Sequence, residues 1–145
     1  MSLIENRKAR FDYDLLEQYE AGVELFGFEV KSLRNKSGSL EGAHVAIRGG
    51  EAYLLNSNIP PYQASNTPKG YDPYRARKLL LKKKEIEELI GKEKSRGLTL
   101  VPLSWYNKRT KIKLSFAVAR GKKKFDKRES IKKRELDRET RRLNH

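Results

Sequence analysis

Three carboxylates near the start of the chain have a spacing that suggests chemistry. Asp12, Asp14 and Glu17 are close enough in sequence to hold a divalent metal for phosphodiester hydrolysis. The same acids also suit the solvated start of a helix, where one of them caps the first turn. We favour that interpretation and keep a metal-dependent nuclease as the minor alternative. His44 has no evident acid partner, so we interpret it as an ordinary strand residue and not as a general base.

No other pattern of residues indicates catalysis. The chain has no Cys, and its second histidine is the last residue, His145, so a thiolate nucleophile, a disulfide and a zinc–thiolate site are all excluded. The sequence contains no nucleophile elbow, phosphate-binding loop or dinucleotide fingerprint. We therefore expect a protein that is not an enzyme and that uses no metal or cofactor.

The chemistry that remains is binding to a polyanion. The 145 residues include 33 Lys and Arg against 19 Asp and Glu, which gives a net charge of +14. Clustered cations suit phosphate groups, and Tyr and Trp side chains can stack on exposed bases. A basic protein that is merely well solvated is the alternative. We find no apolar run long enough to span a bilayer and no signal-peptide pattern, so we expect a cytoplasmic protein without membrane contact.

Residues 20–34 should form the element that positions the binding groups. They are rich in β-branched and aromatic side chains, which favours a strand. The apolar alternation changes phase between Leu25 and Phe26, and Gly27 lies at the switch. A missing side chain at that point permits a bulge or bend. The pattern predicts one long, bent strand that serves two packing surfaces, as in a small barrel.

The segments on either side of this strand are predicted as follows. Residues 13–20 should form a short helix with Leu15, Leu16 and Tyr19 as its apolar stripe. The basic residues 6–10 before it are either a frayed terminus or an arm that faces RNA. Residues 35–42 are rich in turn formers and should form a loop.

A hairpin is predicted around Gly49 and Gly50, which tolerate the positive φ of a two-residue turn. That register pairs Arg48 with Glu51 and places Val45 opposite Leu54 on the core face. Residues 58–70 contain three prolines and should form a long loop.

The second half of the chain combines a helix with two strands. Asp72 and Pro73 suit a helix start, although residues 75–81 are also compatible with an extended chain. Helix is predicted for the second half of residues 74–91, ending at Gly91. Residues 99–105 and 112–118 alternate as strands, and Pro102 indicates an edge position or a bulge in the first of them.

Together these elements predict a mainly β fold with helices. The economical architecture for residues 1–120 is a small antiparallel β-barrel of oligonucleotide-binding type, with about six strands and two to three flanking helices. Residues 121–145 form a separate basic tail with eleven Lys and Arg against five Asp and Glu. Its few apolar residues cannot offset the entropy of ordering it, so we expect it to be disordered alone and helical along a polyanion.

Six segments in order resemble the small protein B family, the bacterial SsrA-binding proteins. The segments are Asn6–Arg10, Glu20–Gly22, Glu29–Arg34, Asp72–Leu81, Gly97–Pro102 and Gly121–Arg128. The resemblance implies an oligonucleotide-binding barrel that grips the tRNA-like domain of transfer-messenger RNA. It also implies a tail that becomes helical in the empty mRNA channel and decoding centre of a stalled ribosome.

The resemblance also assigns residues to the two tasks. Positions that match the family's RNA-gripping residues, with the basic residues of its motifs, are Asn6, Lys8, Arg10, Glu20, Lys31, Arg34, Arg75, Arg77, Lys78, Leu80, Lys122, Lys123 and Lys124. The tail positions expected on the ribosome are Asp126, Lys127, Arg128, Lys132, Arg138, Arg142 and Leu143.

The partners that the resemblance implies are transfer-messenger RNA and the ribosome. Elongation factor Tu and alanyl-tRNA synthetase are expected to meet the protein through the same RNA, and the protein is expected to be a monomer. The alternative is a general ribosome-associated RNA-binding or chaperone protein that binds single strands.

Overall fold

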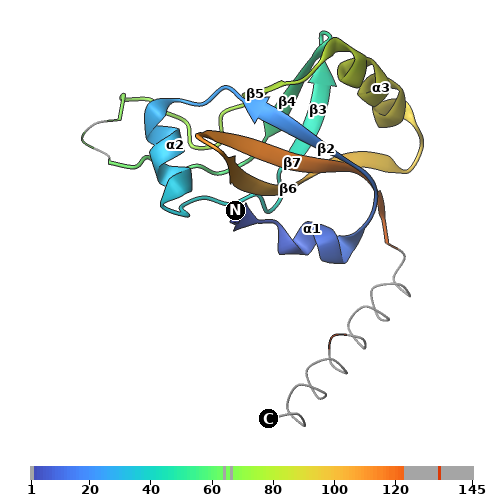
Figure 1. Cartoon of the computed structure of the whole chain (residues 1–145), viewed down its shortest axis with the longest axis horizontal. Helices are drawn as coiled ribbons and strands as arrows, with labels where there is room; N and C mark the ends of the chain where they lie inside the picture. The colour runs from blue at the N-terminus through green and yellow to red at the C-terminus, as the bar shows by residue number, and fades with distance from the viewer. Residues whose placement is uncertain (1, 64, 66, 123–133, 135–145) are drawn as a thin grey trace.

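The computed structural model describes residues 2–63, 65, 67–122 and 134 (Figure 1). In these residues the chain forms seven strands and three helices, in the order β1 (Ser2–Glu5), α1 (Arg7–Asp12), β2 (Tyr13–Val23), α2 (Gly27–Arg34), β3 (His44–Arg48), β4 (Glu51–Leu55), β5 (Arg77–Leu80), α3 (Lys83–Lys94), β6 (Leu98–Lys108) and β7 (Lys111–Gly121).

The seven strands form one antiparallel sheet in the order β1-β6-β7-β2-β5-β4-β3. The sheet curls so that β3 contacts β6, but within the described residues no hydrogen-bonded ladder joins β1 to β3. The prediction of a mainly β fold with flanking helices is confirmed. The structure differs in detail from the predicted small barrel of about six strands, because the curled sheet of the described residues is not closed and has seven strands.

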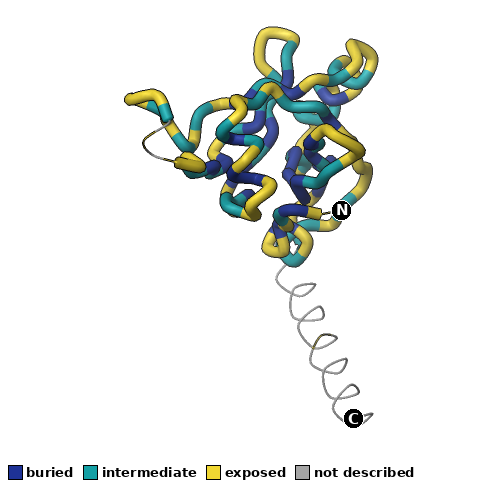
Figure 2. Tube along the Cα trace, turned by 60° about the vertical axis from the view of Figure 1, so that its left-hand side comes forward, coloured by how far each residue is buried: buried dark blue, intermediate teal, exposed yellow. Residues whose placement is uncertain are grey.

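The alternation of β7 divides the core between two clusters. The even-numbered residues of 112–118 lie in the larger cluster, together with the fully buried Trp105. Ala117 and Ala119 point the other way and pack with Ala9 of α1. Their small side chains let the helix lie close to the sheet, and Figure 2 shows that the buried parts of the chain gather inside the body.

The predicted hairpins are confirmed in register. Arg48 pairs with Glu51 and Val45 with Leu54 around Gly49 and Gly50, both of which have positive φ. The β6–β7 register shifts between Pro102 and Ser104, so the predicted proline bulge is present. Its strand is not an edge, because β6 lies between β1 and β7.

The predicted long strand over residues 20–34 is wrong. Strand β2 ends at Val23, and α2 begins at Gly27. The change of phase marks the boundary between a strand and a helix, since Phe26, Val30 and Leu33 recur at helical spacing. The Glu29 carboxylate accepts the Phe26 N–H at 2.7 Å and thereby caps the helix.

The predicted helix over residues 13–20 is also wrong. These residues form β2, which pairs along most of its length with β7. Cross-strand pairing outweighs the local helical spacing of Leu15 and Tyr19 and leaves Leu16 exposed. The helix lies earlier, at Arg7–Asp12, where the Asn6 side chain accepts the Ala9 N–H.

The helix predicted for the second half of residues 74–91 is confirmed, but it ends later than predicted. Asp72 accepts the Tyr74 N–H at 2.9 Å in a turn, but β5 follows, and the helix begins only at Lys83. Residues 77–80 are thus extended, which was one of the two predicted options. The helix then continues past Gly91 to Lys94. No helix in the described part of the chain is long and apolar enough to cross a membrane.

Candidate nucleic-acid interface

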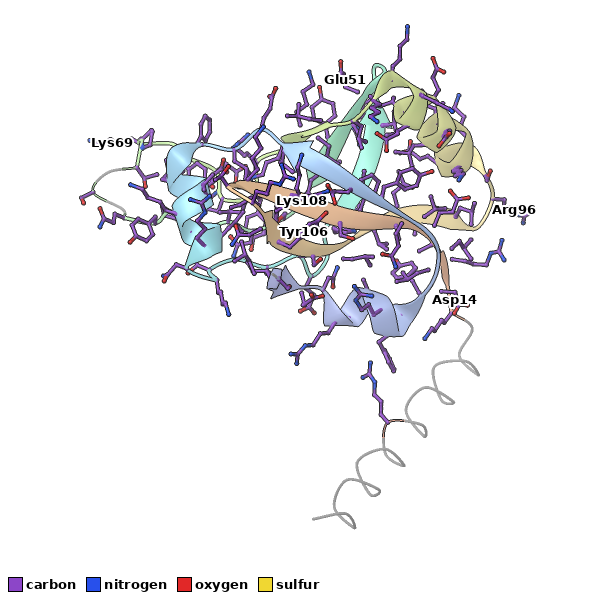
Figure 3. All side chains as sticks on the ribbon, viewed as in Figure 1. Asp14, Glu51, Lys69, Arg96, Tyr106 and Lys108 are labelled. Atoms are coloured by element: carbon purple, nitrogen blue, oxygen red, sulfur yellow. The ribbon has the colours of Figure 1, made fainter. Side chains whose placement is uncertain are left out.

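A carboxylate lies among cations near the end of β2. Glu20 accepts a hydrogen bond from Lys108 Nζ at 2.9 Å, and both side chains are exposed. The pairing of the strands brings Glu20 and Lys108 together. Strand β2 pairs with β7 at the level of Glu20, and β7 pairs with β6, which carries Tyr106 and Lys108 (Figure 3). Hydrogen bonds from Tyr106 and Lys108 lower the pKa of Glu20 below its usual value. The acid therefore stays ionised and offers hydrogen-bond acceptors to a ligand.

The bond between Tyr106 and Glu20 affects both groups. Burial, followed by the hydrogen bond to Glu20 and its negative charge, raises the pKa of the Tyr106 phenol. The phenol therefore stays protonated at neutral pH and is a donor beside the carboxylate.

Gly22 lies between an exposed apolar side chain and a lysine. It pairs with Leu80 of β5 on one side and with Lys113 of β7 on the other. A Cβ atom at Gly22 would lie 3.4 Å from both Leu80 Cβ and Lys113 Nζ. Leu80 is 51% exposed although it lies in a strand. Because Gly22 has no side chain, the surface between Leu80 and Lys113 stays open.

Two adjoining hollows of about 390 and 520 Å³ share Gly22, Leu80 and Lys113 in their walls. We call them together the β2–β5 groove. Arg34 of α2 lines one end, where its Nη2 donates to the Thr110 carbonyl at 2.8 Å. The other end is lined by Glu20 with Lys78 and Lys82 of the β5–α3 region, together with other residues.

The predicted site residues therefore separate into groups. Glu20, Arg34, Lys78 and Leu80 meet at the β2–β5 groove. Lys31 is exposed on α2, which supplies Arg34 to the same groove.

Arg77 does not lie on this surface. Its side chain is 0% exposed, and Nε donates to Glu29 Oε2 at 2.8 Å. Its remaining donors contact the Tyr71 hydroxyl and the carbonyls of Ser57, Pro73 and Arg75 at 2.7–3.2 Å. The predicted direct contact of Arg77 with RNA is inconsistent with this position, because every guanidinium donor has a partner inside the protein.

Glu29 is the acid at the centre of this network. Arg75 donates to both of its oxygens, Arg77 and Tyr71 donate to Oε2, and the Phe26 N–H donates to Oε1. Burial by itself would raise the pKa of Glu29, but the bonds from Arg75, Phe26 and Arg77 outweigh burial and lower it. The network joins α2, β5 and the loop before β5. It fixes the position of half-buried Arg75 and leaves Arg77 a structural role.

Asn6, Lys8 and Arg10 lie at α1 and do not line the β2–β5 groove. Asn6 is buried, and its amide donates to the Leu40 and Pro102 carbonyls at 3.3 and 2.8 Å. It is therefore a structural cap and not an exposed contact. Lys8 and Arg10 are exposed and form long ion pairs with Glu41 and Glu5, at 3.7 and 3.8 Å.

The tail begins beside α1. The Lys122 N–H donates to the Asp12 carbonyl at 2.8 Å. The Arg134 guanidinium lies 5.0 Å from the centre of the Phe11 ring. The remaining predicted residues of the tail lie outside the described residues, namely Lys123, Lys124, Asp126, Lys127, Arg128, Lys132, Arg138, Arg142 and Leu143.

The carboxylates considered for a metal are separated. Glu17 pairs with Lys92 of α3, whereas Asp12 ends α1 beside a hollow of about 330 Å³ that Lys8 and His44 also line. Within the described residues no group of three His, Asp or Glu side chains has the arrangement of a metal site. His44 begins strand β3, as expected of a strand residue.

Sequence reasoning missed the contribution of the β6–β7 hairpin to the groove. Lys111 and Lys113 line it, and Lys108 with Tyr106 holds Glu20. The signal was present in the sequence, because residues 108–113 contain four cations around the predicted turn. Their place on the groove depends on the pairing of β7 with β2, which the predicted helix over residues 13–20 had excluded.

Comparison with known proteins identifies the family. A family model described as SmpB protein matches residues 3–145. The chain belongs to the SmpB family. The SsrA-binding protein of Thermosipho africanus is 52% identical over 134 residues, which cover 92% of this chain and 89% of the relative. The SsrA-binding protein of Gloeothece citriformis is 50% identical over 140 residues, covering 97% and 90%. The family resemblance seen in the sequence is confirmed.

The fold of this SmpB-family chain is also found in a solved structure. That structure is described as "tmRNA-SmpB: a journey to the center of the bacterial ribosome". It matches with a TM-score of 0.70 and 47% sequence identity, over 86% of this chain and 87% of the other.

Proposed function

We propose that this protein is an SsrA-binding protein that binds the tRNA-like domain of transfer-messenger RNA and delivers it to stalled ribosomes for trans-translation. The names of its relatives and of the solved structure support the RNA and the ribosome as partners. The observation that carries the proposal is the β2–β5 groove, where ionised Glu20, exposed Leu80 and Lys113 meet on a protein of net charge +14.

The groove offers three kinds of contact to RNA. Lys113 and its neighbouring cations bind phosphates, which gives affinity without sequence information. The Glu20 carboxylate accepts hydrogen bonds from the amino and imino groups of base edges. Leu80 presents an apolar surface to a base or sugar. The protein carries out no catalysis in this function, and it binds and positions the RNA.

The α1 side and the tail have a different role in this proposal. Lys8, Arg10 and Lys122–Lys124 contact RNA beside α1, while Asn6 and Arg77 position their elements. Residues 1–120 form the body, and residues 121–145 become helical in the mRNA channel and decoding centre. Elongation factor Tu and alanyl-tRNA synthetase meet the protein through the RNA. We propose that it acts as a monomer in the cytoplasm.

The decisive experiment is a salt titration of RNA binding. The full chain should bind a transfer-messenger RNA transcript tightly, and log affinity should fall linearly with log salt. Lys113→Ala should reduce that slope by about one. Lys83→Ala is the matched control, because Lys83 is exposed but does not line the groove. Equal binding to a duplex of the same length, or to any single strand, would refute specific recognition and favour the general RNA chaperone.

A second arm separates RNA binding from action on the ribosome. Deleting residues 126–145 should leave RNA affinity nearly unchanged and abolish tagging on stalled ribosomes in a reconstituted translation reaction. If RNA binding and tagging are lost together, the division of labour between body and tail is wrong.

A further inference from the structure

The beginning of α2 carries an exposed stack of planar groups. Phe26 is 51% exposed, and the Arg75 guanidinium lies 4.3 Å from the centre of its ring. Phe28 stacks with Phe26 at 5.5 Å between ring centres and 25° between planes. Tyr71 meets Phe28 edge-on at 4.7 Å. Nucleic-acid bases stack on exposed aromatic rings and on guanidinium planes of this kind.

The stack is held rigidly from beneath. The Phe26 N–H donates to Glu29 Oε1 at 2.7 Å, and Arg75 Nε donates to Glu29 Oε2 at 3.1 Å. Arg75 Nη2 also donates to the Glu24 carbonyl at 3.3 Å. The Phe26 backbone and the Arg75 guanidinium that packs on its ring are therefore held by the fold before any ligand arrives, which lowers the entropy lost on binding.

The stack follows directly, along the chain, on a residue that lines the β2–β5 groove. Leu25 lines the groove and directly precedes Phe26, and Arg34 at the other end of α2 lines it too. The exposed face of α2 carries Lys31 and Arg34, so a phosphate backbone leaving the groove meets cations on its way to Phe26. This charge favours RNA over an apolar protein partner.

We propose that Phe26, with Arg75 behind it, forms a stacking surface for an unpaired base of the RNA bound in the β2–β5 groove. The inference rests on the proposed function and extends it. It assigns a base-stacking role to a segment outside the residues predicted to grip RNA, apart from Arg75. It also explains why a large aromatic side chain is exposed at the residue that precedes α2.

A tryptophan placed in the stack reports on the bound base. Trp105 is the only tryptophan of the chain and is 0% exposed. In the full-length variant Phe26→Trp, the new indole is therefore the only one that a base can reach. Adding the transfer-messenger RNA transcript should quench its fluorescence in a saturable way. Leu16→Trp is the matched control, because Leu16 is 49% exposed on β2 and does not line the groove.

Affinity gives an independent test. Phe26→Ala should weaken binding about ten-fold, within the range for loss of one base–aromatic stack. The slope of log affinity against log salt should stay unchanged, because no cation is removed. Phe26→Leu keeps a large apolar side chain but removes the aromatic ring, and it should weaken binding to a similar degree. Thermal unfolding checks that both variants are folded.

Each outcome is decisive. Quenching by the transcript, little quenching by a fully paired duplex, and no quenching of Leu16→Trp would support the proposal. The proposal is overturned if Phe26→Trp binds the transcript without quenching, or if folded Phe26→Ala and Phe26→Leu both bind within two-fold of the unaltered protein. If the unaltered protein does not bind the transcript at all, the proposed function fails first and this inference fails with it.

Discussion

Replacing Arg77 should destabilise the fold far more than it changes any RNA contact. The Arg77 side chain is fully buried, and its guanidinium bonds to Glu29, the Tyr71 hydroxyl and three backbone carbonyls. Arg77→Met keeps much of the volume but removes every donor. Removing one partner of a buried ion pair costs about 3–5 kcal/mol, because the other charge is left without compensation.

Urea denaturation followed by circular dichroism measures this loss directly. A change of about 3–5 kcal/mol is a large part of the stability of a small domain, and it should lower Tm by roughly 10 °C or more. Arg77→Lys should recover only part of the loss, because an ammonium group has three donors and no planar fork. A loss below about 1 kcal/mol, combined with a large fall in RNA affinity, would refute the structural role and restore Arg77 as an RNA contact.

The pH dependence of stability tests the same network from the side of Glu29. Its pKa in the folded protein lies below the ordinary value of 4.5, because the bonds from Arg75, Phe26 and Arg77 outweigh the opposing effect of burial. The unfolded state therefore binds a proton more readily, so this stabilisation is present above pH 4.5 and is lost as the pH falls through the folded pKa. Glu29→Gln should be less stable at neutral pH and should lack that acid-dependent loss. An identical acid dependence in both proteins would contradict the assignment.

Two further predictions concern Glu20 and Asn6. Tyr106→Phe and Lys108→Met should each raise the pKa of Glu20 toward its ordinary value, because Tyr106 and Lys108 both lower it. NMR titration of the Glu20 carboxyl carbon measures both changes, and an unchanged pKa in both variants would remove the reason for a fixed acceptor at the groove. Asn6→Ala should lower the free energy of unfolding, measured by urea denaturation, by about 1–2 kcal/mol, because the helix cap and two buried bonds to carbonyls are lost together. If the variant keeps its full stability but loses RNA affinity, Asn6 is a direct contact instead.

The sequence predicted correctly those parts of the fold whose pattern of residues fits a single secondary structure. Residues 112–118 alternate strictly, and the pair Gly49 and Gly50 readily adopts the positive φ that a two-residue hairpin turn requires. In residues 20–34 the apolar residues suit both periods. Phe26, Val30 and Leu33 fit a helix as well as neighbouring residues fit a strand, and the cap at Glu29 decides between them.

The error at β2 has a different origin. Leu15, Leu16 and Tyr19 do have helical spacing, and local propensity contains nothing against a helix. These residues form a strand because they pair with β7 along most of their length, and the two segments are about a hundred residues apart in the sequence. Such pairing cannot be read from a local window, so the partners that β7 supplies to the groove, among them Lys113, were missed as well.

The sequence also does not say which residues of a motif are buried, and this limited the prediction of the site residues. The resemblance assigns Glu20 and Leu80 to RNA-gripping positions and adds Arg77 as a basic residue of the same motifs, but only the structure separates the exposed pair from the buried arginine. A motif marks residues that a family needs, whether they bind the ligand or hold the residues that do. Burial together with a count of occupied donors is what separates these two roles.

The two principal acids of this basic protein show why cations alone do not explain recognition. Glu29 is fully buried, and its oxygens are occupied by Arg75, Arg77, Tyr71 and a backbone N–H, so it can only order the surface above it. Glu20 is exposed, ionised and next to open space at Gly22, so it remains able to accept bonds from a ligand. Contacts to phosphates position an RNA, whereas contacts to bases distinguish one RNA from another. Discrimination between RNAs should therefore depend on Glu20, whereas the lysines of the groove contribute affinity for every RNA and the Phe26 stack adds affinity for an RNA with an unpaired base. Replacing a lysine of the groove should therefore weaken the binding of all RNAs by a similar factor. Glu20→Gln should weaken the binding of the preferred RNA more than the binding of its competitors.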